Sequence, residues 1–196
     1  MKTQQNRTLG AFEKTFWLLD QIDSKDFALA ADISGTKPVE KWQNAINSVQ
    51  RRHPNLSAKI VMDELFRPAL RHVENMTVPL RVVDVQHDDY RWEQEVEKEL
   101  SVRFDTSEGP LLRIVLVQKP SSTVLILVAN HSVADRTSLN FLVRDILLAV
   151  NEKPLMEMDP QLSNDQTLGL SEDQPAKTTE MVPELKVNSD RVKPLV

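Results

Sequence analysis

A histidine that directly follows a buried apolar run is the strongest candidate for chemistry in this chain. Residues 124–129 are all apolar, Asn130 and His131 come next, and Asp135 follows four residues after the histidine. Histidine titrates near neutral pH, so an imidazole in a fixed position can act as a general base. The end of a strand is a rigid place from which to aim such a ring. His131 is therefore the candidate catalytic residue.

Asp135 has two interpretations. Its carboxylate can turn inward and orient the ring of His131, or it can cap a helix that begins at Arg136, because aspartate is a preferred N-cap residue. Ser138 stands three residues after Asp135, where a capping box would require Glu or Gln. The spacing His-x-x-x-Asp recurs by chance in many proteins, so both interpretations stay open at this point.

Other classes of site find little support in the sequence. The chain has no cysteine, which excludes thiolate chemistry and disulfides. The remaining histidines (53, 72 and 87) are scattered and the carboxylates near His131 are not clustered, so we predict no metal site. The four glycines form no phosphate-binding loop, and no Gly-x-Ser-x-Gly segment is present. We therefore expect no bound cofactor.

The composition is that of a globular protein with one domain. The chain has 196 residues, of which 40% are hydrophobic and 27% are charged. No apolar signal segment or membrane-length run occurs, so we expect a cytoplasmic protein without a membrane span. The net charge of −5 lies mostly in residues 151–196, which hold nine acids and five bases. The near-neutral remainder argues against nucleic-acid binding, and we interpret the basic cluster at residues 51–53 as a solvated helix end.

The hydrophobic periodicity alternates between helices and strands. It predicts helices over 11–22, from Thr36 to His53, from Asp88 to about residue 104, and over 136–150, with Thr36 as a cap candidate. Strands are predicted over 27–33, 57–62, 67–73, 78–85, 111–118 and 123–130. The last of these is apolar at nearly every position, which indicates a strand that is covered on both faces. The pattern predicts an open, mixed α/β sheet with helices packed on one side.

Residues 151–196 differ in character from the rest. They contain five of the eleven prolines and no aromatic residue, and they show no clear period. We interpret them as a Pro-rich acidic tail, disordered or loosely packed, that follows a lobe formed by residues 1–150.

Four stretches together resemble a known family. They are Leu-Leu-Asp-Gln at 18–21, Arg-Arg-His-Pro-Asn-Leu-Ser at 51–57, Arg-Phe-Asp-Thr-Ser-Glu-Gly-Pro-Leu-Leu-Arg at 103–113, and Asn-His-Ser-Val-Ala-Asp-Arg at 130–136. In order and spacing the chain is similar to the amino-terminal half of the bilobal acyltransferases. These include nonribosomal-peptide condensation domains, polyketide-associated acyltransferases and alcohol acetyltransferases. Their signature is His-His-x-x-x-Asp-Gly after a buried strand.

The resemblance implies a fold and a reaction. The fold is a single lobe like that of chloramphenicol acetyltransferase, with a mixed, mostly antiparallel sheet. The reaction moves an acyl group from a thioester, of coenzyme A or of carrier-protein phosphopantetheine, to a hydroxyl or an amine. His131 would be the base that takes the proton from the acceptor, and Asp135 would support the motif structurally. The implied partners are a small-molecule acyl donor and an acceptor.

Two residues depart from the family signature. Asn130 replaces the first histidine, a position that does not carry the proton. Arg136 replaces the glycine, where it would narrow a substrate tunnel or bind an anionic group such as a pantetheine phosphate; the steric interpretation is favoured. Asn130, Arg136 and Ser138 are therefore predicted to lie beside the site.

The motifs of the second lobe are absent from this sequence, so three interpretations remain. The chain is an acyltransferase lobe that completes its site with a second-lobe partner or as a homo-oligomer. Alternatively it is an inactive module whose uncovered apolar surface binds a partner, or it is a fragment of a longer protein.

Overall fold

A four-stranded sheet forms the centre of the molecule. The computed structural model describes residues 7–156 together with 158, 163, 165 and 169. The strands lie in the order β2-β7-β6-β5, and all neighbours are antiparallel except β5 and β6, which are parallel. Their bounds are β2 Asp26–Ser34, β5 Leu80–Asp84, β6 Leu112–Gln118 and β7 Ser122–Asn130. The predicted mixed, mostly antiparallel sheet is confirmed, and β2 lies at one of its edges.

A smaller antiparallel sheet stands beside the first. Its strands lie in the order β1-β4-β3, with bounds β1 Arg7–Thr8, β3 Ala58–Met62 and β4 Pro68–His72. A single 3₁₀ turn, η1 (Pro54–Ser57), leads into β3.

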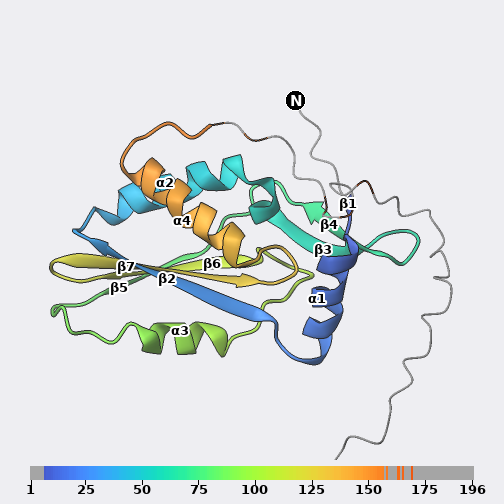
Figure 1. The fold of residues 1–196 in the computed structure, drawn as a ribbon, viewed down its shortest axis with the longest axis horizontal. Coiled ribbons are helices and arrows are strands. Elements are labelled where there is room, and N and C mark those ends of the chain that lie inside the picture. Colours follow the sequence, from blue (N-terminus) through green and yellow to red (C-terminus); the bar gives the residue numbers. More distant parts are fainter. Residues whose placement is uncertain (1–6, 157, 159–162, 164, 166–168, 170–196) are drawn as a thin grey trace, which may run out of the picture.

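Helices cover both faces of the central sheet. The helices are α1 Ala11–Ile22, α2 Val39–Arg52, α3 Glu93–Leu100 and α4 Arg136–Val150. Figure 1 shows α2 and α4 on one side of the sheet and α3 on the other. The prediction of helices on one side therefore holds for α2 and α4. On the opposite face, α3 contributes Val96 to the cover over Val115, Val117 and the neighbouring valines.

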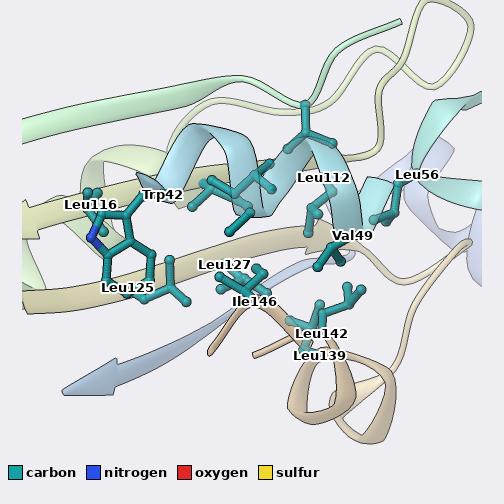
Figure 2. Packing of buried hydrophobic residues seen from close by; sticks show 14 of the residues in the cluster. Trp42, Val49, Leu56, Leu112, Leu116, Leu125, Leu127, Leu139, Leu142 and Ile146 are labelled. Atoms are coloured by element: carbon teal, nitrogen blue, oxygen red, sulfur yellow. The ribbon is translucent and has the colours of Figure 1, made fainter. Parts of the chain in front are cut away.

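The apolar side chains of strand β7 explain why helices cover both faces of the sheet. Its side chains alternate between the two faces, and Val124 to Ala129 are all 0% exposed. Leu125, Leu127 and Ala129 join the cluster formed with α2 and α4, whereas Val124, Ile126 and Val128 face the cluster beside α3. Figure 2 shows the labelled side chains of α2, α4, β6 and β7 meeting in the first cluster. The prediction of a strand covered on both faces is confirmed.

At the ends of α2 one local prediction is wrong and another holds only in part. The helix is capped at Pro38 rather than Thr36, because its first residue is Val39. The basic cluster is solvated only at Arg51, which is exposed, whereas the side chains of Arg52 and His53 are 12% and 10% exposed. Both contact the buried carboxylate of Asp145 on α4, at 3.0 Å from Arg52 Nε and 2.8 Å from His53 Nε2. An acid from another helix thus pairs with Arg52 and His53, which short-range spacing does not reveal.

The acidic tail lies largely outside the described residues. Of 151–196 the structure describes 151–156 and four single residues. Ser163 is buried, and the carboxylate of Asp165 accepts a hydrogen bond from the backbone N–H of Ala11 at 2.6 Å. These two residues lie against the start of α1. The division into a lobe over 1–150 and a tail over 151–196 stays a prediction.

Candidate functional site

His131 lies where the end of β7 meets the connection between α1 and β2, two regions that are far apart in the sequence. Strand β7 ends at Asn130, which pairs with Asp26 at the start of β2. The backbone N–H of His131 then donates to the carbonyl of Lys25 at 3.0 Å. Helix α1 ends at Ile22, just before this point. The site is therefore built from the end of α1, the start of β2 and the end of β7.

The imidazole of His131 is sandwiched between two phenyl rings. The ring of Phe27 lies 4.0 Å away between centroids with an interplanar angle of 18°. The ring of Phe16 lies 4.7 Å away with an angle of 22°. The residue is half-buried, and within the part of the chain that the structure describes neither ring nitrogen has a hydrogen-bond partner. Both faces of the imidazole are thus occupied, while its nitrogen-bearing edges stay available.

Asn130 ties the junction together. It is 0% exposed. Its amide nitrogen donates to Oδ1 of Asp20 at 3.0 Å and to Oδ1 of Asp26 at 2.8 Å. Its amide oxygen accepts from the backbone N–H of Ser132 at 3.0 Å. One side chain therefore joins α1, β2 and the turn that carries His131, so the residue at the position of the family's first histidine has a structural function here.

The carboxylate of Asp20 is a second centre of this network. It is buried at 3% exposure and also accepts from the backbone N–H of Lys25 at 2.8 Å. Arg103 donates to the backbone carbonyl of Asp20, and its guanidinium lies 3.9 Å from the carboxylate. Three of the four stretches that carry the family resemblance thus converge beside His131.

Asp135 caps α4. Its Oδ1 accepts from the backbone N–H of Ser138 at 2.7 Å and from the Ser138 hydroxyl at 2.6 Å. These two hydrogen bonds lower the pKa of Asp135, and the nearby charge of His131 contributes a smaller decrease. The structure therefore places Asp135 at the helix N-terminus, with no hydrogen bond to His131 among the described residues. The turn that carries His131 therefore ends at Asp135, where α4 begins.

The remaining predicted residues lie close by along the chain. Arg136 is the first residue of α4 and is exposed, and Ser138 is half-buried. Ser132 is buried, and its hydroxyl has no hydrogen-bond partner in the described part of the chain. The described residues contain no cluster of acidic and histidine side chains that could hold a metal ion.

The sequence did not identify several residues of this junction. The sequence pattern predicts only that Phe16 lies on a helix face and Phe27 in a strand, and it gives no signal for Asp26. Phe16 stands six residues before the end of α1, and Phe27 stands at the start of β2. Neither position carries a local signal of the contact that both rings make with His131. Only the pairing of β2 with β7 brings Phe27 to Ala129 and so to the neighbouring His131.

Helix α1 leaves much apolar surface uncovered. Phe12, Leu18, Leu19 and Ile22 are between 43% and 83% exposed, and Asp20 is the one residue of this helix that is buried. A separate shallow groove of about 600 Å³ runs along the outer face of α4 and is lined by Val143, Leu147 and Leu148 among others. None of the predicted site residues lines that groove. Among the described residues, no helix is both long and apolar enough to cross a membrane.

Comparison with known proteins identifies relatives of this arrangement. The family model for the condensation domain matches residues 23–159. A polyketide synthase-nonribosomal peptide synthetase of Aspergillus clavatus is 24% identical over 149 residues, which is 72% of this chain and 4% of that protein. Chondramide synthase cmdD of Chondromyces crocatus is 26% identical over 149 residues, 68% of this chain and 4% of that protein.

Solved structures agree in fold. The first condensation domain of the CDA synthetase superposes with a TM-score of 0.70 at 16% identity and covers 80% of this chain and 44% of that one. The condensation domain of the Monacolin K polyketide synthase MokA gives a TM-score of 0.69 at 14% identity, over 84% of this chain and 38% of that one. The chain therefore spans less than half of these solved chains and a small part of the curated relatives.

Proposed function

Because the chain belongs to the condensation-domain family, we propose that it carries the general base of an acyl-transfer site and that His131 is this base. His131 would take the proton of an amine or hydroxyl as that group attacks a thioester carbonyl. The new bond joins the acceptor nitrogen or oxygen to the acyl carbon, the C–S bond breaks, and the thiolate leaves and is protonated. The absence of cysteine is consistent with direct transfer without an acyl-thiol enzyme.

One observation carries the proposal. A half-buried imidazole stands at the end of a rigid strand with both faces packed and its nitrogens without partners in the described chain. A general base needs this combination of a fixed position and a free nitrogen. Asn130 supports the proposal, because its three hydrogen bonds keep the backbone beside His131 in place although the first histidine of the signature is absent.

The donor would be a thioester of coenzyme A or of carrier-protein phosphopantetheine. The names of the relatives favour the carrier-bound form, because polyketide and nonribosomal peptide synthetases are among them. Arg136 is exposed at the start of α4, two residues before the hydroxyl of Ser138. We propose that its guanidinium narrows the approach to His131, with contact to a pantetheine phosphate as the alternative.

The experiment measures thiol release from a panel of acyl-CoA and acyl-pantetheine thioesters offered with amines and alcohols. The full chain is compared with His131→Ala and with His87→Ala, a matched change at an exposed histidine. We expect turnover that is lost in His131→Ala and kept in His87→Ala, with both variants folded by circular dichroism. Equal turnover in the wild type and His131→Ala would refute the role of His131.

A second candidate function is a binding module without activity. The exposed apolar residues of α1 favour it, because exposed apolar surface on a globular protein is often covered by a binding partner. Wild-type chain that releases no thiol with any pair of substrates would refute the catalytic proposal for this chain and favour the module. Light scattering distinguishes the two forms of the catalytic proposal, since a homo-oligomer would bring a neighbouring copy to the site and a monomer would require a second polypeptide.

A further inference from the structure

The two phenyl rings packed against His131 perform a task that a hydrogen bond usually performs. In most sites the second nitrogen of a histidine bonds to a carboxylate or a carbonyl, which fixes the plane of the ring. Here the nearest acid of the motif, Asp135, is occupied with Ser138. Neither nitrogen of His131 has a hydrogen-bond partner among the described residues. Stacking is the contact that remains to orient the ring.

We infer that Phe16 and Phe27 are positioning residues that fix the plane of the His131 imidazole between them. The inference rests on the proposed function of His131. Ring centroids at 4.0 and 4.7 Å with nearly parallel planes leave no room for the imidazole to rotate about its χ2 angle. The edge that carries the nitrogens keeps one direction, toward the acceptor whose proton it removes.

The two phenyl rings are themselves held. Phe27 is the second residue of β2, its backbone pairs with Ala129, and its side chain packs against the main core cluster. Phe16 lies on α1, where the ring of Phe12 contacts it edge-on at 4.9 Å. The backbone of His131 is fixed as well, by its N–H to Lys25. The two phenyl rings, called the clamp below, therefore connect the imidazole to a helix and a strand that Asn130 joins to the same turn by hydrogen bonds.

The clamp predicts a specific kinetic effect. Removing one of the two phenyl rings would let the imidazole rotate, while substrate binding elsewhere is unchanged. A misplaced catalytic group lowers the rate of the chemical step, by about 10- to 100-fold for a small displacement. We therefore expect kcat to fall by about this factor in Phe16→Leu or Phe27→Leu while KM stays within about twofold.

The experiment combines kinetics with NMR of the histidine ring. The variants are Phe16→Leu, Phe27→Leu and the conservative Phe27→Tyr, with Phe66→Leu as the control, because the side chain of Phe66 is 84% exposed on the β3–β4 turn. Phe16 does not belong to a buried core cluster, so Phe16→Leu keeps the test available if Phe27→Leu fails to fold. The NMR signals of the His131 Hε1 and Hδ2 protons report stacking through the ring currents of the two phenyl groups.

In the wild type these protons should resonate upfield of those of the exposed His87. They should move downfield in both leucine variants, and stay in place in Phe27→Tyr and Phe66→Leu. Ring-proton signals that are the same in the wild type, Phe16→Leu and Phe27→Leu would overturn the clamp. Unchanged kcat in a folded Phe27→Leu whose signals have moved would overturn its positioning role. A wild type that shows the shifted signals but transfers no acyl group would instead refute the proposed function and leave the stacking established.

Discussion

Replacing Asn130 by alanine should destabilise the fold far more than a typical change at a polar residue. The substitution removes hydrogen bonds to Asp20, to Asp26 and from the N–H of Ser132 at a position with 0% exposure. A hydrogen bond between neutral groups contributes about 1 kcal/mol, and one to a charged group about 1.5–3 kcal/mol. We expect the free energy of unfolding to fall by about 4 kcal/mol, because Asp20 and Ser132 are buried, Asp26 is half-buried, and each loses a bond.

Urea unfolding followed by circular dichroism measures this change. The matched control is Asn140→Ala, which removes the same side chain from an exposed position on α4 and should alter stability by at most about 0.5 kcal/mol. An Asn130→Ala variant that loses less than about 1 kcal/mol would refute the argument, since it would mean that water or relaxation replaces the three bonds. The same variant should also lower acyl transfer, because the backbone of His131 follows directly on Asn130.

Three further predictions concern buried residues of the fold outside the site. Burial opposes ionisation of Glu95, but hydrogen bonds from Lys98, Tyr90 and Arg81 lower its pKa to about 2. This carboxylate therefore contributes stability above its ordinary pKa of 4.5 that is lost as the pH falls toward 2, at most about 3 kcal/mol. The urea midpoint of the wild type should exceed that of Glu95→Gln at pH 6, and the difference should shrink between pH 4.5 and pH 2; a constant difference would contradict the prediction. His53→Ala removes one partner of the buried Asp145 carboxylate and should lower the free energy of unfolding by about 1–3 kcal/mol in chemical denaturation. An unchanged free energy of unfolding would show that the arginine partners of Asp145 are enough to stabilise its charge. Leu127→Ala leaves a cavity in the centre of the sheet and should cost about 2–5 kcal/mol, measured in the same way, and a loss below about 1 kcal/mol would mean that the core closes over the cavity.

Short-range patterns sufficed for the elements with one strong periodicity. The sequence predicts the bounds of α1 and α4 to the residue. It also predicts that β7 is covered on both faces, because this strand is apolar at nearly every position. The apolar sequence of β7 also placed His131 at the end of a strand. These features depend on residues within one or two turns of one another, which a single sequence displays.

Features that depend on distant segments were missed. The sequence suggested that Asp135 either orients the imidazole or caps a helix, and the structure has it capping α4. It gave no indication that Phe16 and Phe27 would enclose His131, because the contact arises only when β2 pairs with β7. The buried pair of His53 and Asp145 was missed for the same reason, since its partners come from two helices packed together.

The pairing of the edge strand β2 with β7 has a consequence for how the chain folds during its synthesis. Asp26 and Asn130 are 104 residues apart. Strand β2 is synthesised first and has no neighbour in the sheet until β7 has been translated. Contacts between segments so distant in sequence form slowly, because the intervening chain must first be closed into a loop. We therefore expect the two phenyl rings to enclose the imidazole late in folding. A nascent chain that stops before Asn130 contains both phenylalanines but no site.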